Sequence, residues 1–214
     1  MLRPVSLVLL LLVTAATGIP ASRHKSHRTS GQAGAFDFYL FVLSWSPEFC
    51  YSHPSAAQCS KHTGFIVHGL WPQNNDGSYP LDCQTSQPGP SNPDSMGDIM
   101  PAEIIQHEWI QHGTCSGLSG DEYFALIREL SRSIRIPDRM KAPAQSFTIS
   151  TADLKRAFEE ANPGLDDREM AIQLRGNYLN AVEFCRAKTA NPARAACSGV
   201  KDTRSGTFVI PPVH

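Results

Sequence analysis

Two segments of the chain concentrate side chains that can donate and accept protons. The first, residues 65–73 (FIVHGLWPQ), places His68 at the end of an apolar run and follows it with Gly69 and Trp71. A histidine beside a strand is more often a hydrogen-bonded core residue than a catalyst. His68 by itself therefore leaves both the structural and the catalytic interpretation open.

The second segment, residues 107–115 (HEWIQHGTC), separates polar from apolar side chains. On a helix, at about 100° per residue, four polar side chains share one face. They are His107, Glu108, Gln111 and His112. Trp109 and Ile110 fall on the opposite face, where they would enter a core. Glu108 and His112 are four residues apart, which allows their side chains to touch.

A metal-dependent hydrolase is the first alternative, because the zinc-protease motif also begins with His-Glu. That motif places its two histidines four residues apart on one side of a helix. His107 and His112 are instead five residues apart, which is about 140° around the helix axis. The chain also holds no Cys-x-x-Cys pair. We therefore expect no metal and no other cofactor, while a polar helix face with two ordinary histidines remains the structural alternative.

Two imidazoles and a carboxylate suit metal-free acid–base catalysis, because imidazole titrates near neutral pH and a carboxylate can orient it. The chain lacks the Gly-x-Ser-x-Gly signature of a covalent hydrolase. A reaction whose nucleophile belongs to the substrate fits this set, and cleavage of RNA by its own 2′-hydroxyl is such a reaction. Trp71 and Tyr79, close in sequence to His68, could stack a base.

The elements that must position these residues are mixed helices and strands. Strands are predicted at residues 36–45, 63–70, within 170–184 as a pair turning near Gly176-Asn177, and at 207–210. Helices are predicted at residues 101–112, 121–134 and 151–161, the last capped by Ser150. The stretch 72–98, rich in proline and polar residues, is expected to be a long surface loop. Because no regular βαβ repeat is present, the fold class is α+β.

Composition limits the class of protein further. The 214 residues, 41% hydrophobic and 18% charged, suffice for one domain with a core. No internal segment approaches the ~20 consecutive apolar residues that a membrane span needs. The net charge of −1 argues against a polycationic nucleic-acid coat. Six cysteines are enough for three disulfides in an oxidising compartment, although sequence alone leaves their pairing open.

The N-terminus predicts export. Residues 1–21 combine Arg3, the apolar run 7–13 and small residues near a cleavage site, as a secretory signal peptide does. Residues 22–35 hold no apolar residue larger than alanine and predict a flexible basic leader. The remaining domain, residues 36–214, has 15 basic and 20 acidic residues, since residues 1–35 hold four basic residues and no acid. Any anionic ligand must therefore be bound by a local site.

Together the two segments resemble the active-site segments of the ribonuclease T2 family, a family of secreted, disulfide-bonded RNases. Residues 44–50 (SWSPEFC), 76–79 (DGSY) and 178–185 (YLNAVEFC) resemble further family stretches in the same order. The resemblance covers about residues 36–210. It implies an α+β fold with a central antiparallel sheet flanked by helices, and a secreted or periplasmic protein.

The resemblance also implies an activity and its catalytic residues. The expected enzyme is a metal-independent endoribonuclease that cleaves single-stranded RNA with low base specificity. Its products would carry 2′,3′-cyclic phosphate and then 3′-phosphate ends, and DNA would not be cut because it lacks the 2′-hydroxyl. His68 would be the general acid and His112 the general base, and Glu108 would help to stabilise the transition state.

The substrate-binding residues implied by the resemblance include two departures from the family pattern. His107 would contact the phosphate, and Trp71 and Tyr79 would line the first base site. Many members have lysine where this chain has Gln111, whose amide can donate a hydrogen bond but carries no charge. Losing one such electrostatic contact typically costs about 10²–10³ in rate. Gln73 replaces an acid found in some relatives, so the base preference stays open.

The resemblance pairs the cysteines as Cys50–Cys59, Cys83–Cys115 and Cys185–Cys197. The middle pair would tie the loop 72–98 to the catalytic helix. Gln111 keeps one alternative function open, namely a secreted binding or cytotoxic protein of the same fold with impaired catalysis. RNA is the expected partner, and since nothing in the sequence demands an oligomer, we expect a monomer.

Overall fold

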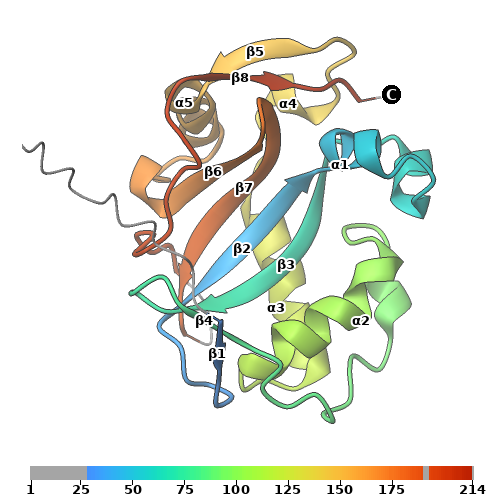
Figure 1. The fold of residues 1–214 in the computed structure, drawn as a ribbon, viewed down its shortest axis with the longest axis vertical. Helices are drawn as coiled ribbons and strands as arrows, with labels where there is room; N and C mark the ends of the chain where they lie inside the picture. Colours follow the sequence, from blue (N-terminus) through green and yellow to red (C-terminus); the bar gives the residue numbers. More distant parts are fainter. Residues whose placement is uncertain (1–27, 190–192, 214) are drawn as a thin grey trace, which may run out of the picture.

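The computed structural model describes residues 28–189 and 193–213, which are built around one six-stranded sheet (Figure 1). The strands are β1 (Arg28–Ser30), β2 (Phe38–Trp45), β3 (Phe65–Gln73), β4 (Tyr79–Leu81), β5 (Phe147–Ser150), β6 (Met170–Arg175), β7 (Tyr178–Ala187) and β8 (Thr207–Ile210). The order in the large sheet is β3-β2-β7-β8-β5, and β6 also pairs with β7. The pairings in this sheet are antiparallel apart from a short parallel contact between β7 and β8.

Within the described ranges, five helices accompany the sheet, which confirms the α+β class. They are α1 (Ser46–Ser52), α2 (Ala102–Gln111), α3 (Gly120–Ser133), α4 (Asp138–Lys141) and α5 (Thr151–Ala161). The three predicted helices correspond to α2, α3 and α5. As predicted, the Ser150 side chain caps α5, because its oxygen accepts a hydrogen bond from the Asp153 amide at 3.0 Å.

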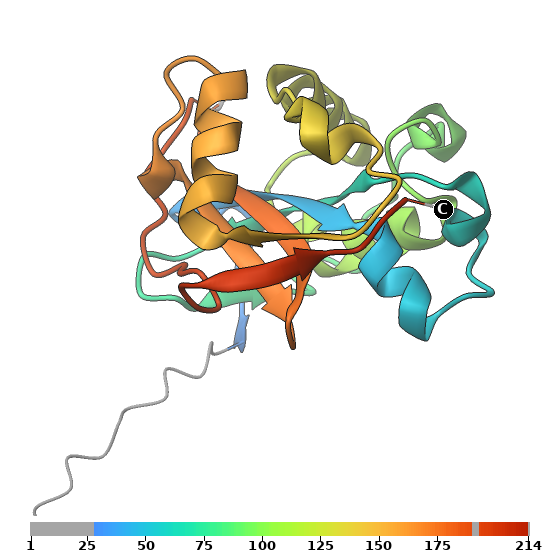
Figure 2. The same cartoon turned by 90° about the horizontal axis from the view of Figure 1, so that it is seen from above.

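The central strand β2 separates two apolar layers, because its side chains alternate between the two faces of the sheet. The side chains on one face are Tyr39, Phe41, Leu43 and Trp45, and they pack in one core with residues of α3 and α5. Figure 2 shows these two helices on the same side of the sheet. The side chains on the other face are Phe38, Leu40 and Val42, in a much smaller cluster with β7. This second face therefore has room for a site.

The stretch predicted as a loop, residues 72–98, is more structured than expected. Residues 71–73 continue β3 by pairing with residues 38–40, so this strand passes its predicted end at residue 70. Pro72 is compatible with the pairing because β3 lies at the edge of the sheet. The loop prediction is also wrong at β4, which pairs with β1 in parallel. Its partner β1 lies within the predicted leader, residues 22–35. The predicted signal peptide, residues 1–21, lies outside the described residues.

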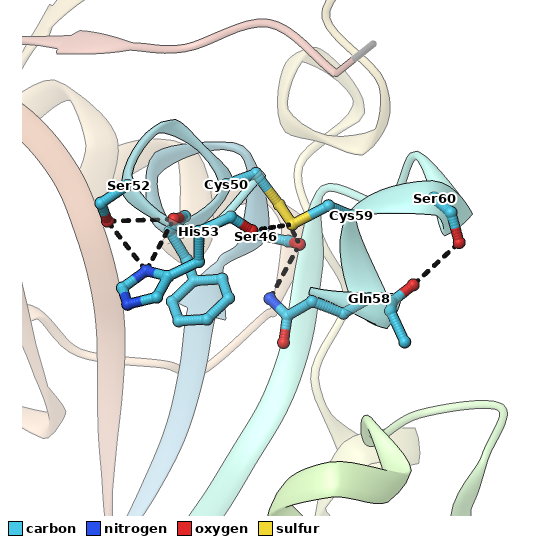
Figure 3. The surroundings of a disulfide bond; sticks show 9 residues. Ser46, Cys50, Ser52, His53, Gln58, Cys59 and Ser60 are labelled. Carbon is cyan, nitrogen blue, oxygen red and sulfur yellow. Dashed lines mark hydrogen bonds between the residues drawn. A yellow bond between two sulfur atoms is a disulfide. The ribbon is translucent and has the colours of Figure 1, made fainter. Parts of the chain in front are cut away.

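All six cysteines are paired as the resemblance implied: Cys50–Cys59, Cys83–Cys115 and Cys185–Cys197. Figure 3 shows the first bridge between α1 and the 3₁₀ turn that follows it, where Gln58 Nε2 also donates to Ser46 Oγ at 3.2 Å. The second bridge fastens the segment after β4 to the 3₁₀ turn directly after α2. Among the described residues, no helix is both long and apolar enough to cross a bilayer.

Candidate active site

Glu108 lies at the centre of the predicted site and is only 1% exposed. Its Oε2 accepts a hydrogen bond from Trp71 Nε1 at 2.7 Å, and its Oε1 lies 3.3 Å from His68 Nε2. Burial by itself would raise the pKa of Glu108. The hydrogen bond from His68, the charges of His112 and His68, and the Trp71 bond together hold that pKa below its usual value. The carboxylate is therefore ionised inside the protein.

Gly69 makes the space that this carboxylate occupies. A Cβ atom at position 69 would overlap Glu108 Oε2 and would lie 2.7 Å from Trp71 Nε1. A glycine inside a strand often marks such a close approach. Any larger residue here would have to displace the Glu108 carboxylate or the Trp71 indole, the two side chains that join the segments singled out in the sequence.

His68 reaches the carboxylate because β3 contains a β-bulge. Val42 pairs with Gly69 and Leu43 pairs with Val67, which leaves His68 without a partner on β2. Ser44 Oγ lies 2.8 Å from His68 Nδ1. The ring is thus held at Nδ1 by β2 and at Nε2 by α2. Its side chain remains 37% exposed, which leaves it accessible to a substrate.

His112 follows the last residue of α2 and stacks on Trp71, with ring centroids 5.0 Å apart and the planes 27° from parallel. Trp71 therefore connects Glu108 and His112, the pair whose spacing on the helix allows contact, because it donates a hydrogen bond to Glu108 and stacks on His112. Burial lowers the pKa of His112 to about 4, although the charge of Glu108 opposes this shift. At neutral pH the ring is uncharged and can accept a proton.

A hollow of about 610 Å³ opens beside Trp71 and His112. Three more residues singled out from the sequence line it, namely Gln73, Tyr79 and Gln111. The C-terminal part of the chain also lines the hollow, through Gln173, Glu183, Gly199, Val200 and Lys201. A smaller cavity of about 340 Å³ lies between β3 and α3 and is lined by none of these residues. The hollow has the size and the aromatic wall that a planar ring compound needs.

The structure thus brings together six of the seven predicted catalytic and substrate-binding residues, by direct contact or in the hollow. The seventh, His107, is exposed on α2, and its charge reaches His112, whose pKa it lowers. Sequence reasoning assigned no role to Ser44, Gly69 or Glu183. A glycine inside an apolar strand was a usable signal for Gly69, whereas nothing local marks the other two.

The described residues contain no group of three or more His, Cys, Asp or Glu side chains arranged to hold a metal ion. The fold and the site instead define a disulfide-bonded α+β protein with an acid–base centre at the edge of its sheet. The sequence profile of the ribonuclease T2 family matches residues 36–195. The chain belongs to the ribonuclease T2 family.

Curated relatives support RNA endonuclease activity. A ribonuclease of Aeromonas hydrophila is 34% identical over 177 residues, which cover 80% of either chain. Ribonuclease DdI of Dictyostelium discoideum is 30% identical over 184 residues, covering 75% of this chain and 78% of the relative. Both relatives span most of their own length in these alignments, so the similarity extends well beyond the two active-site segments.

Solved structures agree on the fold. An RNase-related protein from Calystegia sepium superposes with a TM-score of 0.63 at 20% identity, covering 84% of this chain and 98% of that chain. Ribonuclease MC1 from the seeds of bitter gourd also gives a TM-score of 0.63, at 22% identity, covering 81% of this chain and 99% of that chain. At this level of identity these structures establish the architecture alone.

Proposed function

We propose that this protein is a metal-independent endoribonuclease that cleaves single-stranded RNA through the 2′-hydroxyl of its substrate. The observation that carries the proposal is the buried, ionised Glu108 between His68 and Trp71, with a neutral His112 stacked on the same indole. Two imidazoles around one carboxylate can transfer protons in opposite directions in one reaction.

In the first step His112 takes the proton of the 2′-hydroxyl while O2′ forms a bond to phosphorus. The P–O5′ bond then breaks, and His68 protonates the departing 5′-oxygen. Glu108 stabilises the positive charge that His112 acquires, because its carboxylate already raises the proton affinity of that ring. The product is a 2′,3′-cyclic phosphate, and attack by water with the two histidines in exchanged roles opens it to a 3′-phosphate.

The phosphate and the base would be held by residues around this centre. His107 and Gln111 would contact the phosphate, and Gln111 would donate a hydrogen bond to the phosphorane without adding charge. Trp71 and Tyr79, on the wall of the hollow, would hold the base of the nucleotide whose 2′-hydroxyl reacts. This reaction excludes DNA as a substrate.

The alternative function is a secreted binding or cytotoxic protein of the same fold. Gln111 favours it, because the hollow then lacks the positive charge of a lysine at that position. The contacts among His68, Glu108 and Trp71 favour catalysis instead. Three disulfides fit an oxidising compartment, so a secreted or periplasmic location is proposed in either case. A monomer is proposed as well, because nothing in the sequence demands an oligomer.

The test is to incubate the mature protein with yeast RNA and with a defined oligoribonucleotide in EDTA, and to identify the product ends. Cyclic phosphate ends are expected from the wild type. They should be absent for His112→Ala and present for the control His53→Ala, which removes an exposed histidine of the segment after α1. Loss of activity in EDTA, or 5′-phosphate ends, would overturn the mechanism. Binding of RNA without cleavage would favour the alternative.

A further inference from the structure

Glu183 is a buried acid on the wall of the hollow that the proposed mechanism does not use. It is 7% exposed, and it lines the same hollow as Trp71 and His112. Among the described residues no lysine or arginine forms an ion pair with it. A buried carboxyl without a cationic partner is costly and therefore calls for an explanation.

The strand register fixes where Glu183 stands relative to the catalytic strand. Gly69 of β3 pairs with Val42 of β2, and Val42 pairs with Glu183 of β7. Residues that pair directly point to the same face of a sheet, and neighbouring strands are ~4.8 Å apart. Glu183 thus lies in the same row as Gly69, roughly 10 Å across the open face.

The orientation of the Glu183 carboxyl is fixed by Gln173 on β6. Gln173 Nε2 donates to Glu183 Oε2 at 2.8 Å and to the Lys201 carbonyl oxygen at 3.1 Å, and its Oε1 accepts from Thr203 Oγ1 at 2.7 Å. Both ends of the amide are therefore engaged, which holds the Gln173 side chain in this orientation. Glu183 Oε2 is occupied, which leaves Oε1 as the oxygen that can meet a ligand.

We infer that Glu183 is a specificity-determining residue of the base site, where its carboxylate accepts a hydrogen bond from the exocyclic amino group of the base held beside Trp71. The inference rests on the proposed function, and it names the chemistry that the base must offer. Cytosine and uracil have the same size, but cytosine carries an amino group where uracil carries a carbonyl oxygen. An ionised carboxylate accepts from the former and repels the latter.

The charge on this carboxyl depends on pH, and its neighbours determine how. Burial raises the pKa of Glu183 to about 7, and the negative charge of Asp202 adds to this rise. The hydrogen bond from Gln173 and the charge of His68 act in the opposite direction and lower the pKa. Lys201, which is exposed, is a further charged residue lining the hollow. The carboxyl is therefore mostly ionised at pH 8 and mostly protonated at pH 5.5. The preference for cytosine should accordingly be larger at pH 8 than at pH 5.5, and this test needs no variant.

The main experiment compares kcat/KM for the dinucleotides CpU and UpU, because steps common to both substrates cancel in the ratio. The wild type should prefer CpU by roughly tenfold at pH 8. Glu183→Ala should bring the ratio near one by slowing CpU. Glu183→Gln should shift it towards UpU, since its amide can face Gln173 with oxygen and the base with NH₂. Glu160→Gln, which changes an exposed acid of α5, is the matched control and should leave the ratio unchanged.

A purely structural role would slow CpU and UpU equally, and that result would overturn the inference while leaving the proposed function intact. Calorimetry of 3′-CMP and 3′-UMP binding tests the base preference separately from catalysis. If no dinucleotide is cleaved, the proposed function fails, but tighter binding of 3′-CMP that depends on Glu183 and on pH still supports the inference. Equal binding of the two nucleotides at both pH values by the wild type overturns it, whatever the variants do.

Discussion

At the residue scale, the site depends on how a few neighbours set the charge of each titratable group. Glu108 stays ionised although it is buried, because His68 and Trp71 bond to its two oxygens. His112 stays neutral although Glu108 is near, because burial is the larger effect. The result is a proton acceptor and a negative charge side by side, which are needed for abstraction of a hydroxyl proton.

The pH dependence of catalysis follows from the His112 ring. Because the base must be neutral and burial lowers its pKa to about 4, the acid limb of the kcat/KM profile should lie near pH 4. An unperturbed histidine would give this decline near pH 6.5. The measurement is kcat/KM for one dinucleotide from pH 3 to pH 8 at constant ionic strength. An acid limb near pH 6.5 would assign the base to another group.

A substitution at position 111 tests whether the positive charge of a lysine, which Gln111 does not provide, would speed up catalysis. Gln111→Lys would place a cation on the wall of the hollow, and we expect kcat to rise by up to about 10², since one electrostatic contact to a phosphorane is typically worth that much. Gln106→Lys, on an exposed position of α2, is the matched control and should change kcat little. Equal rates for wild type and Gln111→Lys would show that this position does not face the reacting phosphate.

At the scale of elements, β3 and α2 form the site because two local irregularities let them approach. The bulge re-aims His68, and Gly69 leaves room for Glu108. Gly69→Ala should therefore lower kcat/KM by at least about tenfold, because a displacement near 1 Å in a catalytic constellation can cost about 10²-fold. Far-UV circular dichroism and thermal melting would show whether the fold is kept. Wild-type activity in a folded Gly69→Ala would contradict the close approach.

The three disulfides are predicted to differ in their effect on catalysis. Cys83–Cys115 anchors the segment after β4 to the turn that follows His112. Cys50–Cys59 joins α1 to its neighbouring turn. The double variant Cys83→Ser/Cys115→Ser should lose more activity than Cys50→Ser/Cys59→Ser when both are assayed below their melting temperatures. Activity that survives loss of the middle pair would refute this difference.

The helices α2, α3 and α5 were predicted from local signals, namely Pro101 in a first turn, the helical spacing of apolar residues within 121–134 and the Ser150 cap. Among the elements that escaped prediction, α1, α4 and β5 span 7, 4 and 4 residues. Such short segments complete at most two turns or a few pairs, so their sequences carry no readable period. The loop prediction for residues 72–98 was wrong at β3 and β4 for a related reason, since pairing across the sheet overrode the polar, proline-rich composition.

At the scale of the whole molecule, Glu183 makes folding stability depend on pH. Its folded-state pKa, about 7, lies above the usual 4.5, so the folded state holds this proton more tightly than the unfolded state does. The stability it contributes is complete below about pH 4.5 and is lost as the pH rises through 7, in total about 3 kcal/mol. The measurement is the urea-unfolding free energy of wild type and Glu183→Gln at pH 4.5, 6 and 8. If the difference in unfolding free energy between the two proteins does not change with pH, this pH dependence is contradicted.

The sequence by itself determined which residues are candidates for the chemistry. The two polar segments, the amphipathic helices, the even number of cysteines and the family resemblance are all written in residue type and spacing. The tertiary structure alone decided that His68 sits on a bulge, that Ser44 holds its second nitrogen, and that Glu183 lies in the row of Gly69 two strands away. These features depend on strand register between residues far apart in the chain. Side-chain alternation within one strand restricts the register of its pairing, but it does not determine which other strand it pairs with.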